Sequence, residues 1–115
     1  EADAEAVEEA VGAAHEAQPA WAARSAADRA DILRRAADLY EENAAEFFAL
    51  CGREAGKTLG DAVAEVREAV DFLRYYASEA VNHEASTQAR GVIACISPWN
   101  FPMSIPARKI APALQ

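Results

Sequence analysis

Apolar residues recur every three or four positions in the first half of the chain, which is the spacing of one face of an α-helix. Ser25 and Asp28 have the arrangement of a capping box, so we expect a helix to begin at Ser25. Asn43 and Glu46 offer a second N-terminal cap, and Gly56 offers a C-terminal stop. The pattern therefore predicts two helices with a bend near Asn43.

The clearest periodicity follows, on a helix that is predicted to start near Asp61. Its apolar positions form an unbroken stripe that is expected to face the core, namely Val63, Val66, Val70, Leu73, Ala77 and Val81. Another side of the same helix carries acidic and aromatic residues, namely Glu65, Glu68, Phe72 and Tyr75. Acidic residues beside aromatic ones usually form a solvated rim, and we expect one here.

The N-terminal stretch is rich in alanine and glutamate and has few large apolar residues. It favours a helix that buries little and frays, and the Gln18-Pro19 pair is expected to end it.

The character of the chain changes at Gly91. Residues 92–96 are apolar without polar alternation, which favours a strand buried on both faces of a parallel sheet. Ser97 to Pro102 break this strand, and residues 103–114 return to a helical pattern in which prolines at 106 and 112 are expected to introduce a bend. Strand, turn and helix make half of a Rossmann-like unit, so we predict an α/β fold with a helical region at 1–90 and an incomplete α/β unit at 91–115.

A single buried strand has no parallel partner elsewhere in this sequence. Each buried backbone group without a partner costs about 1–3 kcal/mol, and several of them would outweigh the net stability of a small domain. We therefore expect the chain to be the opening piece of a larger fold.

Charge and composition narrow the function classes. The 115 residues include 19 acidic and 11 basic side chains, a net charge of −8, which argues against a nucleic-acid or anionic-membrane surface. No apolar run approaches the roughly 20 residues of a membrane span, and the first stretch is unlike a signal peptide, so we expect a cytoplasmic location. The cysteines and histidines have no metal-ligand spacing, and no metal site is predicted.

Two motifs favour structural interpretations. Gly56-Lys57-Thr58 lacks the earlier glycine of a phosphate-binding loop and follows a helix instead of a strand, so a nucleoside triphosphatase is rejected. Cys51 lies on an apolar helix face and Cys95 lies within the predicted strand, so both are expected to be small core residues and not nucleophiles.

The turn after the predicted strand is the strongest candidate site, because ligands of open α/β sheets bind at the carboxyl ends of strands. Ile96 to Pro102 place Asn100 between rigid prolines, where its amide could donate a hydrogen bond to a developing oxyanion. The alternative is a structural turn in which Asn100 caps the next helix, and the residues alone leave the two interpretations equal.

The same turn carries a family resemblance. Ile96 to Pro102 resembles the Pro-Trp-Asn-Phe-Pro signature of the aldehyde dehydrogenase superfamily, and Lys109 to Leu114 continues it in the family's manner. Glu54 to Lys57 matches the family's upstream Glu-x-Gly-Lys motif. Within the superfamily, Arg53 to Thr58 and Ala64 to Ala77 are most similar to the L-glutamate γ-semialdehyde dehydrogenase module of bacterial bifunctional proline utilization A proteins.

The resemblance implies an aldehyde dehydrogenase-like fold and an NAD-dependent oxidation of L-glutamate γ-semialdehyde to L-glutamate in proline catabolism. It implies that residues 91–115 begin the NAD-binding unit and that Asn100 supplies the oxyanion-hole amide. It implies that Phe101 forms part of the aldehyde pocket and that Glu68 approaches the substrate ammonium group. The residues implied on the nicotinamide-ribose side of the cofactor are Ile96, Ser97, Pro98 and Trp99.

The resemblance also sets expectations for the parent protein. The chain ends before the positions of the family's catalytic glutamate and nucleophilic cysteine, so residues 1–115 alone are expected to be inactive. The cofactor is expected to be NAD, with NADP as an alternative, and FAD is expected only if a proline dehydrogenase module lies upstream. The parent is expected to be a homo-oligomer that binds a small aldehyde. Alternatives are a dehydrogenase for another semialdehyde or aldehyde, and a non-catalytic helical interaction protein.

Overall fold

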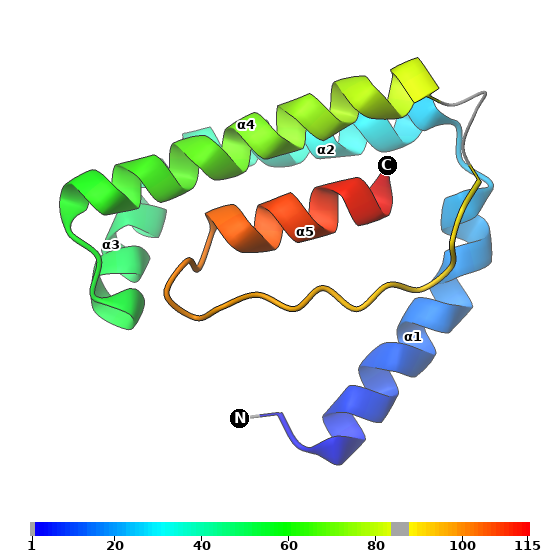
Figure 1. Cartoon of the computed structure of the whole chain (residues 1–115), viewed down its shortest axis with the longest axis horizontal. Coiled ribbons are helices and arrows are strands. Elements are labelled where there is room, and N and C mark those ends of the chain that lie inside the picture. Colours follow the sequence, from blue (N-terminus) through cyan, green and yellow to red (C-terminus); the bar gives the residue numbers. More distant parts are fainter. Residues whose placement is uncertain (1, 84–87) are drawn as a thin grey trace.

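The structure is a computed structural model that describes residues 2–83 and 88–115. Within these residues it contains five helices and no strand (Figure 1). The helices are α1 (Ala4–Ala22), α2 (Ala26–Glu42), α3 (Ala44–Ala55), α4 (Leu59–His83) and α5 (Ser104–Leu114). α2 and α5 both pack against the long α4, and α3 closes one end of the α2–α4 pair.

The core lies mainly between α2 and α4. Its buried residues are mostly alanines with a few larger side chains, an arrangement that lets the two helix backbones approach closely. The predicted stripe on α4 is confirmed at its centre, where Val66, Val70 and Leu73 are buried. It is wrong at its ends, because Val63 is only half-buried and Val81 is 46% exposed. The small and polar positions buried on α4 beside the stripe are Ala62, Glu65, Ala69 and Ala80.

Local capping explains where most helices begin and end. The Ser25 hydroxyl accepts a hydrogen bond from the Asp28 amide at 3.1 Å, which confirms the predicted start of α2. Gly56 adopts the left-handed conformation with φ of 64° and ends α3 as predicted. The Thr58 hydroxyl accepts from the Asp61 amide at 3.2 Å, so α4 begins earlier than Asp61.

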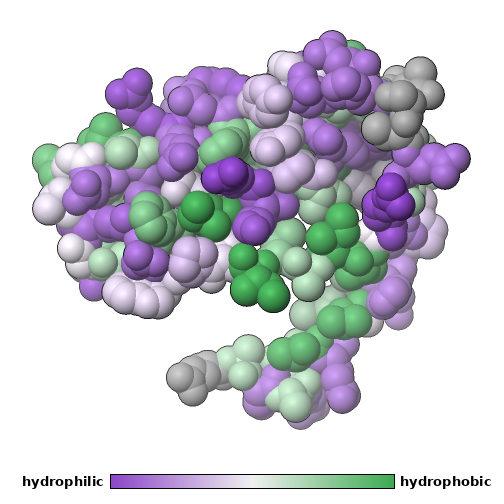
Figure 2. All heavy atoms as spheres, viewed as in Figure 1, coloured by the Kyte–Doolittle hydropathy of each residue, from purple (hydrophilic) through white to green (hydrophobic). Residues whose placement is uncertain are grey.

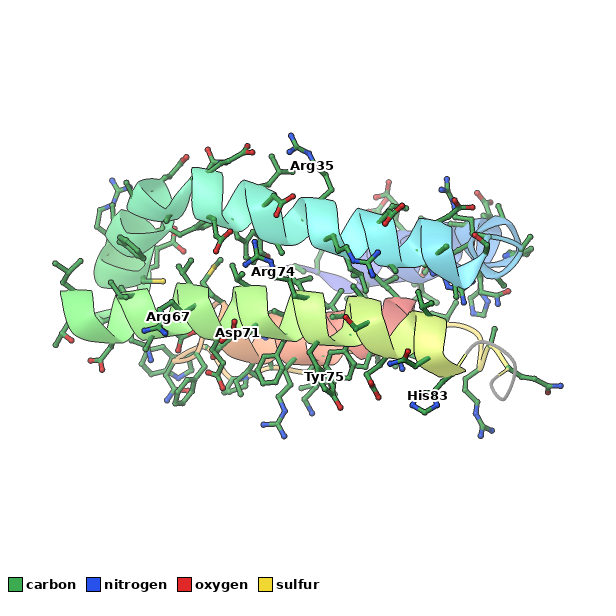
Figure 3. The ribbon with its side chains drawn as sticks, turned by 90° about the horizontal axis from the view of Figure 1, so that it is seen from above. Arg35, Arg67, Asp71, Arg74, Tyr75 and His83 are labelled. Carbon is green, nitrogen blue, oxygen red and sulfur yellow. The ribbon has the colours of Figure 1, made fainter. Side chains whose placement is uncertain are left out.

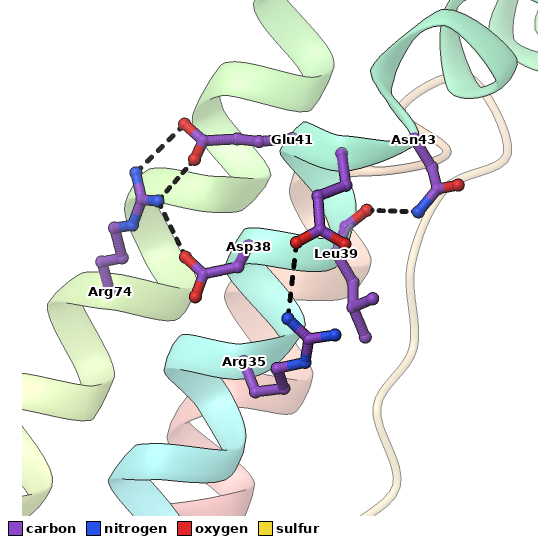
Figure 4. Close-up of polar contacts among 7 residues, drawn as sticks. Arg35, Asp38, Leu39, Glu41, Asn43 and Arg74 are labelled. Carbon is purple, nitrogen blue, oxygen red and sulfur yellow. Dashed lines mark hydrogen bonds and ion pairs between the residues drawn. The ribbon is translucent and has the colours of Figure 1, made fainter.

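The expected role of Asn43 is wrong. Its side chain makes no cap for α3, although the chain does bend there. Instead the Asn43 amide nitrogen donates to the Leu39 carbonyl at 2.8 Å (Figure 4). The Leu39 carbonyl also accepts from the backbone amide of Asn43 at 3.1 Å, so the Asn43 side chain adds a second donor at the end of α2 and leaves the start of α3 without a side-chain cap.

Helix α1 is longer than predicted, because it continues through Pro19 to Ala22. Proline removes one intrahelical hydrogen bond, and the carbonyl that loses its partner belongs to the exposed His15, where water can solvate it. The Trp21 indole also holds the last turn, since its N–H donates to the Leu114 carbonyl at 3.1 Å. As expected, α1 contributes no buried residue.

An exposed charge cluster links α2 to α4. Arg74 points from α4 toward α2 (Figure 3), where its guanidinium donates to Asp38 at 3.2 Å and to Glu41 at 3.1 Å (Figure 4). The pKa of the Arg74 guanidinium is raised, first by its hydrogen bonds to Glu41 and second by its hydrogen bond to Asp38. Such exposed pairs add little stability but favour one register between the two helices.

The predicted buried strand is wrong for this chain. Residues 91–96 are extended but form no strand, and Ile96 is 82% exposed. A strand needs the amides and carbonyls of a neighbouring strand, and the described residues contain no second extended segment beside this one. Cys51 is buried as predicted, whereas Cys95 is exposed because its segment is uncovered.

Helix α5 forms where the sequence predicts it, despite its two prolines. Pro106 lies in the first turn, where an amide N–H has no intrahelical partner, so the proline costs no hydrogen bond. At the other end the Leu114 carbonyl accepts from Trp21, and the Gln115 carbonyl accepts from Arg29 at 3.0 Å. None of the described helices has the length and apolar character needed to cross a bilayer.

Candidate functional site

The candidate site is the turn that joins the extended segment to α5, in residues 97–103. Asn100 is exposed at the tip of this turn, with Trp99 before it at 78% exposure and Phe101 after it at 41%. The amide of Asn100 is therefore accessible to a molecule that approaches this surface. An exposed position is what a hydrogen-bond donor to a substrate requires.

A buried carboxylate fixes the end of this turn. Glu65 on α4 is only 3% exposed, and its Oε2 accepts from the Met103 amide at 3.1 Å and from the Ser104 amide at 3.0 Å. These amides belong to the N-terminus of α5, where N–H groups lack intrahelical partners and negative charge is favoured. The expectation that Glu65 lies on a solvated rim is wrong, because α5 covers it.

Lys57 completes the cluster from the loop between α3 and α4. Its ammonium donates to the other oxygen of Glu65 at 3.0 Å and lies 4.2 Å from the centre of the Phe101 ring. Gly56 places Lys57 there by ending α3 in a left-handed turn. The structure thus brings together the two motifs on which the family resemblance depends.

The electrostatics of the cluster favour an ionised Glu65. Burial raises the pKa of its carboxyl group, but hydrogen bonds from Ser104, Lys57 and Met103 together outweigh burial and leave the pKa below its ordinary value. Nearby, burial and then the negative charge of Glu65 raise the pKa of the Cys51 thiol. Cys51 is therefore a poor source of thiolate, which agrees with its predicted structural role.

The implied cofactor residues lie on one exposed strip before Asn100. Ile96, Pro98 and Trp99 are exposed and Ser97 is half-buried. A hollow of about 480 Å³ adjoins this strip, and its lining is Ile96, Pro98, Ile105, Arg108 and Lys109. Apolar surface beside two cations fits a dinucleotide, which combines flat rings with anionic phosphates.

The implied substrate residue Glu68 lies on α4 one turn after Glu65, and its side chain is exposed. The ring of Phe101 contacts the Lys57 ammonium and is partly exposed to solvent.

The part of the chain that the structure describes contains no group of residues that could hold a metal ion.

Sequence reasoning missed Glu65 and Lys57 as partners of the turn. A signal for Glu65 was present, because it shares the helical face of Ala62 and Ala69, both of which are buried. No comparable signal exists for Lys57, because its contacts depend on how the loop and the turn meet in space.

A second, apolar groove of about 420 Å³ runs between α1, the extended segment and the end of α5. Apolar residues gather along it in Figure 2, on the side of the molecule where α1 leaves the body. Its lining includes Trp21, Val92, Ile93, Ile110 and Leu114. None of the residues implied in catalysis lines this groove.

The fold and the two joined motifs are those of an aldehyde dehydrogenase. The model of the Aldehyde dehydrogenase family matches residues 1–115, and the chain belongs to this family. The chain is 48% identical over 110 residues to the bifunctional protein PutA of Escherichia coli (strain K12), covering 94% of this chain and 8% of that protein. It is 42% identical over 125 residues to the alpha-ketoglutaric semialdehyde dehydrogenase of Bacillus subtilis (strain 168), covering 96% and 26% respectively.

Solved structures agree with these similarities. A mutant of proline utilization A (PutA) from Bradyrhizobium japonicum has a TM-score of 0.87 and 37% identity, covering 99% of this chain and 13% of that one. Aldehyde dehydrogenase 21 from Physcomitrella patens, solved with the reaction product succinate, has a TM-score of 0.85 and 28% identity, covering 98% and 27%. The aldehyde dehydrogenase-like fold is therefore confirmed, and the chain spans only a small part of each relative.

Proposed function

We propose that this chain is part of an NAD-dependent dehydrogenase that oxidises L-glutamate γ-semialdehyde to L-glutamate in proline catabolism. The observation that carries the proposal is the 48% identity to a PutA protein over nearly the whole chain. The turn around Asn100 and the Glu-x-Gly-Lys loop, which contact each other in the structure, both lie within the aligned family region. The complete activity belongs to the longer polypeptide, whose nucleophile and catalytic glutamate lie outside residues 1–115 in this proposal.

In this proposal Asn100 stabilises negative charge. When a nucleophile attacks the aldehyde carbon, the carbonyl oxygen becomes an oxyanion, and the Asn100 amide donates a hydrogen bond to it. An amide held in place before the reaction pays no reorganisation cost, and such a donor contributes about 100- to 1,000-fold to turnover. The exposure of Asn100 on a turn fixed at its end by Glu65 supports this role.

The strip formed by Ile96, Ser97, Pro98 and Trp99 is proposed to be one wall of the cofactor site, in an NAD-binding unit that begins near Gly91. NAD, when bound, accepts the hydride that leaves the aldehyde carbon. The rings of Trp99 and Pro98 would exclude water from that region, and the exposed Arg108 and Lys109 at the adjoining hollow would attract the phosphates.

Two further residues are proposed to select the substrate. L-Glutamate γ-semialdehyde carries an ammonium group, and the exposed carboxylate of Glu68 would form a charge-assisted hydrogen bond with it. The ring of Phe101 would form part of the wall beside the aldehyde chain. Simple aliphatic aldehydes lack the ammonium group and would gain nothing from Glu68.

The role of Asn100 is tested in the full-length enzyme that contains this chain. Asn100→Ala should lower kcat by about 100- to 1,000-fold, because the oxyanion loses a donor. Asn82→Ala on α4 serves as the matched control and should leave kcat unchanged. An Asn100→Ala enzyme with normal turnover would overturn the proposed role.

The role of Glu68 is tested with two substrates. Glu68→Ala should raise KM for L-glutamate γ-semialdehyde and leave the kinetics of a simple aliphatic aldehyde unchanged. An equal loss on both substrates would show a general defect and would contradict a contact with the ammonium group.

The 42% identity to an alpha-ketoglutaric semialdehyde dehydrogenase favours a second candidate substrate, which has an oxo group in place of the ammonium group. Competition between the two semialdehydes for the intact enzyme separates these candidates. If the oxo compound is preferred and Glu68→Ala has no effect on it, the second candidate replaces the first.

A further inference from the structure

We propose that Glu65, together with Lys57, is a positioning residue for Asn100 and sets where its amide lies relative to α4. This inference rests on the proposed function, since it concerns how the oxyanion donor is held. In the proposed function Glu65 makes no contact with the reacting atoms. It acts through the backbone of the turn that carries Asn100.

The first support is the completeness of the contacts. One oxygen of Glu65 accepts from the Met103 and Ser104 amides at 3.1 and 3.0 Å, and the other accepts from Lys57 at 3.0 Å. With the carboxylate only 3% exposed, water contributes little to its solvation. Removing one partner of a buried charge is strongly destabilising, so a conformation that breaks one of these contacts is higher in free energy.

The second support is the position of Asn100 between two fixed points. Phe101 directly after Asn100 lies against the Lys57 ammonium, and Met103 three residues after it is bonded to Glu65. Both points are tied to the same ion pair, and that pair is anchored on the long helix α4. A shift of the ion pair would therefore move the turn that presents the Asn100 amide.

The third support is that local structure does not position the turn. Met103 makes no side-chain cap at the start of α5, and the buried Ser104 hydroxyl has no hydrogen-bond partner in the described part of the chain. The free amides of α5 are satisfied by a residue 38 to 39 positions earlier in the sequence. The start of α5 depends on Glu65 for its place.

The variant Glu65→Gln tests this dependence with almost no change in shape. Its amide can still accept from the α5 backbone, but its NH2 group then faces the Lys57 ammonium, and two donors repel. We expect the turn to shift and kcat of the full-length enzyme to fall by about 10- to 100-fold, the cost of a misplacement near 1 Å. Glu79→Gln on the same helix is the matched control and should keep normal kcat.

A double-mutant cycle separates positioning from general stability. In the Asn100→Ala background there is no donor left to misplace, so adding Glu65→Gln should change kcat by less than about twofold. A further fall in kcat equal to that of the single variant would overturn the inference, because it would show that Glu65 does not act through Asn100.

Lys57→Met provides an independent variant in case Glu65→Gln does not fold, because it keeps an unbranched side chain and removes the ammonium that contacts both Glu65 and the Phe101 ring. It should also lower kcat when Asn100 is present and have no added effect when Asn100 is absent.

Failure of the inference is distinguishable from failure of the proposed function. If Asn100→Ala lowers kcat but neither Glu65→Gln nor Lys57→Met does, only the inference fails. If Asn100→Ala has no effect, the oxyanion role of Asn100 in the proposed function fails, and the inference that rests on it fails with it.

Discussion

The paired helices α2 and α4 and the segment from residue 88 to 103 are built on opposite principles. The helix pair supplies its own partners, since backbone groups bond within each helix and small buried residues such as Ala37 and Ala77 fit between the two. The segment is extended and exposes apolar side chains, including Ile93 and Ile96. It is fixed to the body at its end, through Glu65 and Lys57.

This contrast explains how one short chain combines stability with an accessible site. A helix meets its hydrogen-bonding needs from neighbours in sequence, whereas an extended segment needs a second segment beside it. The helical part therefore serves as the support, and the exposed turn at the end of the segment is free to meet a ligand. The buried ion pair connects the two parts.

The largest expected effect is on the helix pair. Leu33→Ala removes a side chain that is 2% exposed at the centre of the core and should cost about 2–5 kcal/mol of local stability. Amide hydrogen exchange of α2 and α4 in the intact protein measures this loss. Leu39→Ala on the same helix, at 40% exposure, should cost less than about 1 kcal/mol, and equal losses would contradict the core assigned here.

The next effect concerns the link between the two regions. The pKa of Glu65 is lower in the folded protein than its ordinary value of 4.5. The ionised carboxylate therefore stabilises the fold fully at pH values above 4.5. This stabilisation is lost as the pH falls through the lower pKa of the folded state. At neutral pH, Glu65→Gln should cost about 1–3 kcal/mol, and at acid pH the difference from the natural protein should vanish. Thermal unfolding across this pH range tests the sign, and a difference that grows on acidification would contradict it.

A smaller effect is expected at the loop that places Lys57. Gly56 has φ of 64°, a conformation that costs a residue with a Cβ about 1–2 kcal/mol, so Gly56→Ala should lower stability by that amount. Gly60→Ala, in the first turn of α4 where φ is negative, is the matched control. Unfolding of the two variants side by side tests the assignment, and equal stability would show that the left-handed turn is not required.

The smallest effect is expected at the start of α2. Ser25→Ala removes the hydroxyl that accepts from the Asp28 amide and should cost about 1 kcal/mol. Ser78→Ala, which removes an exposed hydroxyl within α4, should have a much smaller effect. Amide exchange in the first turn of α2 is the measurement, and unchanged protection there would contradict the cap.

The helices were predictable because their signals are local. Ser25, Gly56 and the stripe through Val66 and Val70 are each read from a few neighbouring residues. The residues 91–96 also have the apolar pattern of a strand, but whether a strand forms depends on a partner that the sequence pattern does not contain. The same limit applies to the site, since the meeting of Glu65 with Met103 and Ser104 joins positions far apart in the chain.

A crystal structure of the intact protein with NAD and L-glutamate bound tests the role of Asn100 most directly. We expect the Asn100 side-chain nitrogen within about 2.7–3.1 Å of a product carboxylate oxygen, with Glu65 still bonded to the amides of Met103 and Ser104. A structure in which Asn100 instead turns back to cap α5, with the product bound elsewhere, would contradict this role.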